Sequence, residues 1–220
     1  MSTWIGAVVE TRGREDFWDI LRRHGVELLA TGAPPAFAFI ECTRAFSALA
    51  PPAFSGALSR DVGGMVLAFF AQTNVDVYEL QCFRSGERVR LLEYTRDRGG
   101  WIKQEGEVQP WERSFFFEEG STVDGAAWPD LLDTEMSELS EEDRARYEAA
   151  KRSGDATPVL DLLHPHSTRP LHRLCASFGV DPSAPVGRWR PPRSAKPWLL
   201  LGVVLAFFVG MSLLGALTRR

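Results

Sequence analysis

Three histidines and one cysteine lie within 12 residues of each other, namely His164, His166, His172 and Cys175. Histidine and cysteine are preferred ligands of zinc, so their spacing has to be compared with that of zinc sites. The spacing, H-x-H-x5-H-x2-C, fits no such pattern, and Pro165 between the first two histidines indicates a turn. We therefore expect solvated histidines and a buried thiol, with no metal and no cofactor. These four side chains are the candidate ligands if a metal is bound.

A second group of polar side chains is expected to lie along the predicted strands in the middle of the chain. Its members are Asp76, Glu79, Glu93, Arg96 and Asp97. The candidate catalytic residues are Asp76, Glu93 and Asp97, because two carboxylates in different environments can act as general acid and base. Salt bridges to Arg88 or Arg90 explain the same acids without catalysis. The sequence lacks G-x-S-x-G, H-E-x-x-H and a glycine-rich loop ending in Lys-Ser/Thr, so no common catalytic motif supports an enzyme.

The middle of the chain is predicted to form a series of antiparallel strands joined by tight turns. The strands are expected over 65–73, 76–83, 87–95 and 101–107. Because the first of them is apolar on both faces, it should lie in the centre of a sheet. The third alternates Arg88 and Arg90 with apolar residues, so one of its faces should be solvated.

The rest of the first 119 residues is predicted to complete an α+β domain. Two further strands are expected over 3–9 and 36–42, and helices over 14–24, 52–62 and 110–119. The fold class is therefore α+β, with a mainly antiparallel sheet and helices packed on one side of it.

Part of this region resembles a known type of domain. The stretch QTNVDVYE…YTRD…QPWE, within residues 60–117, is similar to an uncharacterised bacterial α+β domain that has the same QT, VD, YTRD and QPWE elements. That domain has no established activity, so the resemblance implies no substrate, cofactor or site residue. It implies a bacterial source and a domain boundary near residue 120.

An acidic helical segment is predicted to follow over 120–180. Residues 118–155 hold 12 acidic and four basic side chains, and 120–136 read as a loop. A helix over 140–154 is well signalled, with Ser140 as its cap, acids in its first turn and Gly154 after its last. Two short helices are expected to begin near Thr157 and Thr168. A Pro/Arg-rich linker is then predicted over 181–196.

The C-terminal residues are predicted to form one transmembrane helix. Residues 197–217 contain no charge, and 21 residues at about 1.5 Å each span roughly the 30 Å of a hydrocarbon core. Trp198 stands at the headgroup level of such a helix. Gly202, Ala206 and Gly210 recur at intervals of four, which places three small residues on one face. That face is the candidate contact for a homodimer or a partner helix, although small residues are also common in membrane helices.

The flanking charges predict the orientation of this helix. Four basic residues precede it and two follow it. The four are Arg188, Arg190, Arg193 and Lys196, which are also candidates for contact with anionic lipid headgroups. The excess on the N-terminal side, together with the absence of a signal-peptide pattern and three scattered cysteines, predicts that the domain faces the cytoplasm. The chain thus resembles the tail-anchored class of single-pass membrane proteins.

Charge also limits the partners. Residues 1–187 carry a net charge of −10, whereas residues 188–220 carry six basic and no acidic residues. An acidic domain of this kind is a poor ligand for nucleic acid, which requires clustered Lys and Arg. The expected partners are the lipid bilayer and either another protein or a second copy of the chain. The predicted function is a non-catalytic binding or scaffold module, and the alternatives are a membrane-tethered enzyme and a ligand sensor that signals by helix pairing.

Overall fold

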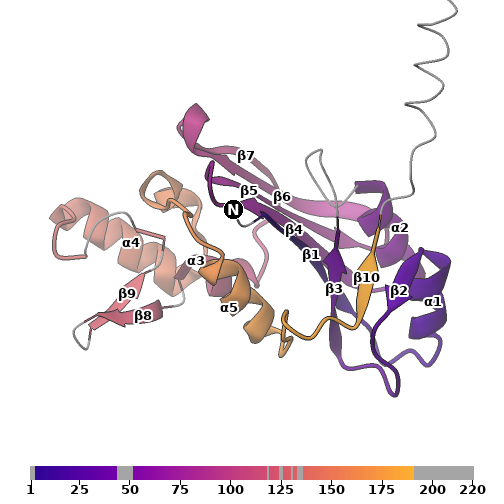
Figure 1. Ribbon diagram of the computed structural model, residues 1–220. Helices are drawn as coiled ribbons and strands as arrows, with labels where there is room; N and C mark the ends of the chain where they lie inside the picture. The colour runs from indigo at the N-terminus through magenta and orange to yellow at the C-terminus, as the bar shows by residue number, and fades with distance from the viewer. Residues whose placement is uncertain are drawn as a thin grey trace, which may run out of the picture. The chain divides into compact units, whose positions relative to one another are not determined.

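An eight-stranded sheet organises the computed structural model of the protein (Figure 1). The structure describes residues 3–43, 52–117, 119–123, 126–129, 131–132 and 136–190. These residues belong to one compact unit. The predicted transmembrane helix over 197–217 lies outside the described residues, as do Arg193 and Lys196.

The sheet is mainly antiparallel, as predicted. Its strand order is β2-β10-β3-β1-β4-β5-β6-β7, and only β3 and β10 run parallel to each other. The strands are β1 (Thr3–Glu10), β2 (Val26–Leu28), β3 (Phe37–Cys42), β4 (Met65–Gln72), β5 (Val77–Arg84), β6 (Glu87–Thr95), β7 (Gly100–Gly106) and β10 (Gly187–Trp189). The apolar strand β4 lies between β1 and β5, so its predicted place inside the sheet is confirmed.

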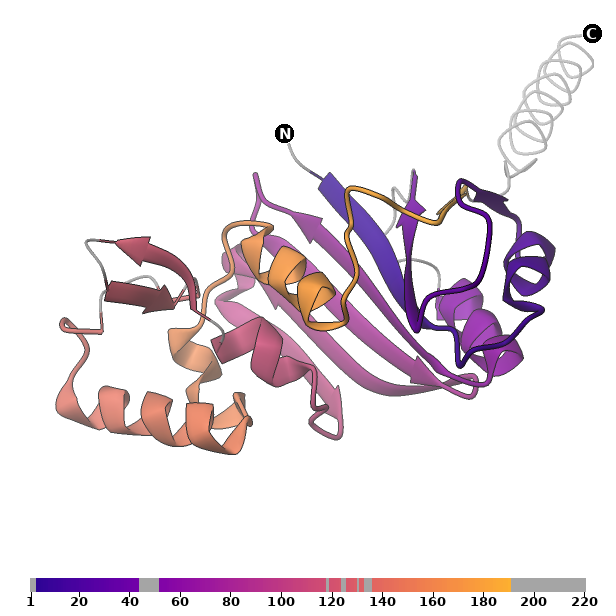
Figure 2. The same cartoon turned by 90° about the horizontal axis from the view of Figure 1, so that it is seen from below.

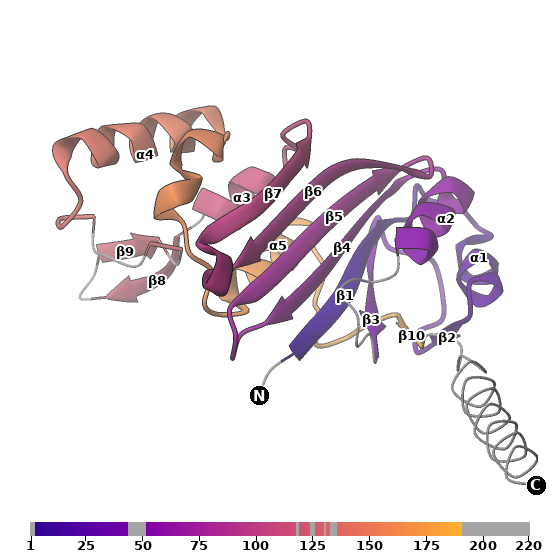
Figure 3. The same cartoon turned by 90° about the horizontal axis from the view of Figure 1, so that it is seen from above.

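Helices cover both faces of the sheet, whereas the sequence predicted cover on one side only. On one face, α1 (Phe17–Arg23) and α2 (Pro52–Val62) pack with Val66 and Ala68 of β4 (Figure 3). On the other face, α3 (Glu112–Phe117) and α5 (Arg169–Ser177) pack with Leu67 and Phe69 of the same strand (Figure 2). Two-sided cover follows from the apolar composition of β1 and β4, since successive side chains of a strand point to opposite faces.

The acidic segment is partly strand and partly helix. A two-stranded hairpin, β8 (Glu119–Val123) and β9 (Ala126–Pro129), occupies part of the predicted loop. The predicted helix is confirmed as α4 (Glu141–Ser153), where Ser140 Oγ accepts a hydrogen bond from Asp143 N at 3.0 Å. Only Tyr147 and Ala150 of α4 are buried, so most of its surface is solvated. The 3-10 helix η2 (Thr157–Leu162) joins it to α5.

The strand β10 corrects the predicted linker over 181–196. Residues 187–189 of that range lie inside the sheet between β2 and β3. Trp189 is buried there and stacks on Phe54, with ring centroids 4.5 Å apart. A Cβ at Gly187 would meet Val26 Cγ1 at 2.5 Å, which explains why a glycine begins the strand. Across the described ranges of the chain, none of the helices is long and apolar enough to cross a membrane.

Candidate functional site: a polar pocket at the end of the meander

A pocket with a volume of about 170 Å³ lies at one end of strands β4 to β7. Two connections meet there, the turn between β4 and β5 and the 3-10 helix η1 (Arg96–Arg98) between β6 and β7. A segment that follows η2 closes the third side. The lining residues are Asp76, Tyr94, Arg96, Gly99, Gly100, His164, Pro165 and His166, and we refer to them as the Asp76–His166 pocket.

An ion pair between Asp76 and Arg96 joins the two connections. The Arg96 guanidinium Nη1 donates to Asp76 Oδ2 at 3.0 Å, and Arg96 N donates to the Asp76 carbonyl at 3.2 Å. Asp76 has a left-handed backbone with a φ of 44°, which aspartate tolerates better than most residues. The side chain of Asp76 is 14% exposed and that of Arg96 is 71% exposed. The carboxylate is therefore sheltered, whereas the guanidinium faces solvent.

A tyrosine–histidine contact forms the opposite wall. Tyr94 is buried on β6, and its hydroxyl lies 3.3 Å from His164 Nδ1. Two backbone contacts hold the histidine segment in place, since His164 N donates to the Leu131 carbonyl at 2.7 Å and Trp101 Nε1 donates to the Leu163 carbonyl at 2.8 Å. The pocket is thus built by side chains that are about 70 residues apart in the sequence.

The turn after η1 requires glycine. Gly99 and Gly100 have φ values of 86° and 120°, a region that favours glycine. Because neither has a side chain, this wall of the pocket consists of backbone.

The hydroxyl, thiol and amine nucleophiles of serine, cysteine and lysine are absent from the described lining of the pocket. The three thiols are buried elsewhere in the fold, and burial raises their pKa to about 12 for Cys42, about 11 for Cys82 and about 12 for Cys175. Thiols in such surroundings are protonated and inert at neutral pH.

The structure brings together one of the predicted acids and two of the predicted histidines. Asp76, His164 and His166 all line the pocket, although the sequence suggested them separately. Asp97 is exposed on η1 outside the lining. His172 stacks on Trp4 with ring centroids 4.4 Å apart. Cys175 is buried in α5, and within the described ranges no three His, Cys, Asp or Glu side chains are grouped so that they could hold a metal ion.

Glu93 belongs to a different polar group, on β5, β6 and β7. It stands opposite Glu79 in the sheet, and Lys103 Nζ lies 2.7 Å from Glu93 Oε2. Glu79 itself is 6% exposed and accepts a hydrogen bond from Gln81 Nε2 at 2.5 Å. Burial raises the pKa of Glu79 to about 7. This buried acid is the perturbed carboxylate of the meander, and it lies outside the pocket lining.

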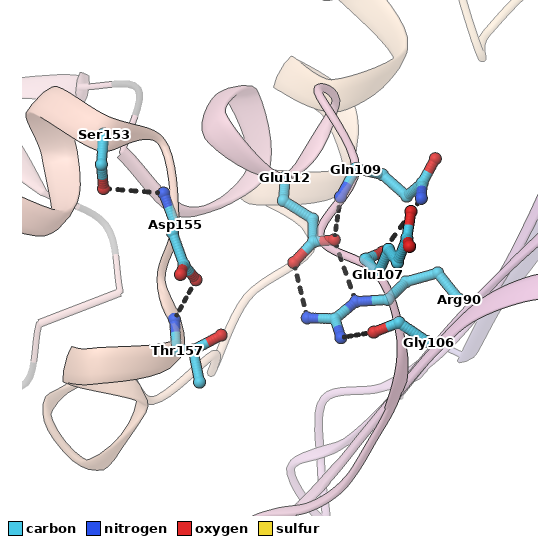
Figure 4. Close-up of polar contacts among 8 residues, drawn as sticks. All are labelled: Arg90, Gly106, Glu107, Gln109, Glu112, Ser153, Asp155 and Thr157. Atoms are coloured by element: carbon cyan, nitrogen blue, oxygen red, sulfur yellow. Dashed lines mark hydrogen bonds and ion pairs between the residues drawn. The ribbon is translucent and has the colours of Figure 1, made fainter.

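Arg90, predicted on a solvated face, is buried in an ion pair with Glu112 (Figure 4). Its Nε and Nη2 atoms donate to the two carboxylate oxygens of Glu112, each at 2.9 Å, and its Nη1 donates to the Gly106 carbonyl at 2.9 Å. Glu112 also accepts from Gln109 N at 2.6 Å. The pair connects α3 to β6, and its role is structural.

The sequence elements that carry the resemblance lie in two places, the Asp76–His166 pocket and the buried ion pair of Arg90 and Glu112. The VD and YTRD elements contribute Asp76, Tyr94 and Arg96 to the pocket, whereas QPWE contributes Glu112 to the buried ion pair. Comparison of the chain with protein-family models, with curated proteins and with solved structures found no match. The resemblance over residues 60–117 therefore stays a prediction.

The residues assigned to membrane contact are only partly described. Arg188 Nε lies 2.6 Å from Glu41 Oε2, and Arg190 Nη2 lies 3.6 Å from Glu27 Oε2. Both arginines therefore have partners within the sheet. The positions Trp198, Gly202, Ala206 and Gly210 lie outside the described residues.

Proposed function

We propose that this chain is a single-pass, C-terminally anchored membrane protein whose cytoplasmic domain is a non-catalytic binding module. The Asp76–His166 pocket is its ligand site. One observation supports this function above others, namely that polar side chains from the meander and from the segment after η2 converge on a single concave site. Convergent polar groups in a pocket are the usual mark of a small-molecule site.

Binding is favoured over catalysis because the described lining offers no unpaired carboxylate that could act as a base. The only carboxylate in the lining, Asp76, is neutralised by Arg96 at 3.0 Å, and the buried acid Glu79 is outside the lining. A general base needs a group that is not already committed to a cation. The pocket is therefore better suited to hold a ligand than to remove a proton from it.

The membrane anchor is supported by the sequence of residues 197–217, which is long enough and apolar enough to span a bilayer. In this proposal the domain lies on the cytoplasmic side. The small-residue face of Gly202, Ala206 and Gly210 is the contact for a second helix.

A ligand screen on the full-length protein in detergent tests the function. A compound that binds the folded state raises the unfolding temperature, and the rise grows with its concentration. We expect compounds that stabilise the wild-type protein and fail to stabilise a His164→Gln variant. Stabilisation that is identical in both proteins would place binding elsewhere and contradict the proposal.

A specific contact favours one alternative, an acid–base enzyme. The 3.3 Å approach of His164 Nδ1 to the Tyr94 hydroxyl is the geometry by which an imidazole can accept a phenolic proton. Chromatography of each stabilising compound after long incubation separates the two functions. A binding module returns the compound unchanged, whereas conversion that is lost in Tyr94→Phe would establish an enzyme.

A further inference from the structure

We infer that the Asp76–His166 pocket binds a compact soluble oxyanion, that is, a small molecule whose carboxylate or phosphate group contacts Arg96. This inference rests on the proposed function, because it names the class of ligand for the same site. It follows from the polarity, the exposure and the size of the lining.

Side chains that can donate a hydrogen bond outnumber carboxylates in the lining of the pocket. Arg96, His164, His166 and Tyr94 can all donate hydrogen bonds from their side chains, and Asp76 is the single carboxylate. An anion therefore has more partners here than a cation.

The placement of the charges also favours an anion as the ligand. The sheltered carboxylate of Asp76 is 14% exposed, whereas the Arg96 guanidinium is 71% exposed. His166 is also exposed. Arg96 and His166 are therefore more accessible to a ligand from solvent than the Asp76 carboxylate is. Arginine presents its donors in a planar fork that matches a carboxylate or phosphate.

The size of the pocket favours a small ligand. Its volume of about 170 Å³ is below the ~300–1,000 Å³ of sites for drug-sized molecules. A divalent metal would require several oxygen ligands, and the lining supplies one carboxylate. A compact anion fits both the volume and the donors.

Four probes on the full-length protein in detergent test the inference: sodium acetate, inorganic phosphate, methylammonium chloride and sodium chloride at equal ionic strength. The unfolding temperature is measured at pH 7 against probe concentration. We expect acetate or phosphate to stabilise the protein beyond sodium chloride, and methylammonium to have no effect.

Two variants and two matched controls locate the binding. Arg96→Gln should weaken the affinity for the anion about tenfold or more, because a charge-assisted hydrogen bond is lost. Arg98→Gln, which changes an exposed arginine of the same 3-10 helix outside the lining, should leave it unchanged. Asp76→Asn should strengthen anion binding several-fold, since it removes the opposing charge and asparagine accepts the left-handed backbone. Asp97→Asn is its control.

The outcomes separate this inference from the function on which it rests. Stabilisation by methylammonium that is abolished by Asp76→Asn would make the pocket a cation site and overturn the inference, while the binding function would stand. The inference would also be overturned, and the binding function would stand, if acetate and phosphate had no effect while an uncharged compound from the screen bound in a way that requires His164. If no probe and no screened compound binds at the pocket, both proposals are wrong.

Discussion

Glu79 is a buried carboxylate whose protonation differs between the folded and unfolded chain. It is 6% exposed, and burial raises its pKa from 4.5 to about 7. As the pH rises from about 4.5 to about 7, the unfolded chain loses this proton before the folded chain does. The stability contributed by protonated Glu79 is complete below pH 4.5 and is lost as the pH passes through 7, by an amount on the order of 3 kcal/mol.

The variant Glu79→Gln tests this linkage, because glutamine imitates the protonated acid. We expect Glu79→Gln to match the wild-type stability at pH 4.5 and to exceed it by about 2–3 kcal/mol at pH 8. Urea unfolding at both values measures the difference. Glu105→Gln, which changes an exposed acid on β7, is the control and should show no such divergence. Equal stabilities of Glu79→Gln and wild type at pH 8 would contradict the prediction.

At the scale of single elements, the short helix α3 depends on the ion pair of Arg90 and Glu112, whose side chains are 4% and 1% exposed. We expect Arg90→Met to cost about 3–5 kcal/mol of unfolding free energy, because it leaves the Glu112 carboxylate buried and unpaired. Replacing both partners, Arg90→Met with Glu112→Leu, should recover part of that loss. Chemical denaturation of the wild type, both single variants and the double variant measures the coupling between the two side chains.

Another ion pair of β6 serves as the matched comparison. Arg88 and Glu105 are 37% and 54% exposed and lie 2.7 Å apart. Arg88→Met should cost less than about 1 kcal/mol, as is usual for exposed pairs. If Arg88→Met and Arg90→Met cost similar amounts of unfolding free energy, burial of the Arg90 pair would not increase its contribution to stability.

The strand β10 makes a second prediction for an element. Trp189 fills a space against Phe54 in the core, so Trp189→Ala should cost about 3–5 kcal/mol of unfolding free energy. Arg190→Ala, one position further along, changes an exposed side chain and should cost less than about 1 kcal/mol. The measurement is again urea unfolding. A Trp189→Ala variant as stable as the wild type would remove β10 from the core.

The sequence predicted those helices and strands whose pattern is contained within their own residues. The meander, α2 and α4 were predictable because turns, apolar alternation and caps are encoded within each segment. The strands β2 and β10 were not, because three-residue strands exist only through pairing with each other and with β3. The burial of Arg90 was missed for the same reason, since its partner Glu112 comes from another element.

The pocket was predictable only in parts. Asp76, His164 and His166 were chosen from residue type and spacing, but nothing local indicates that they meet. Tyr94 was missed because a tyrosine in a strand is indistinguishable from a core residue by sequence. The glycines at 99 and 100 indicated a turn, without indicating that the turn lines a pocket.

At the scale of the whole molecule, the proposed anchor makes a prediction about location. The full-length chain should sediment with membranes and resist extraction by alkaline carbonate, because residues 197–217 are long enough to span the bilayer. A chain without those residues should remain in the supernatant. Carbonate-soluble full-length protein would contradict the proposed anchor.

Histidine NMR of the full-length protein tests the binding function most directly. The chain has four histidines, of which His164 and His166 line the pocket. The other two are internal controls, since His24 pairs with Asp61 at 2.8 Å and His172 stacks on Trp4. When a stabilising compound is added, we predict that the ring signals of His164 and His166 shift while those of His24 and His172 stay in place. Binding that leaves the His164 and His166 signals unchanged would contradict the account.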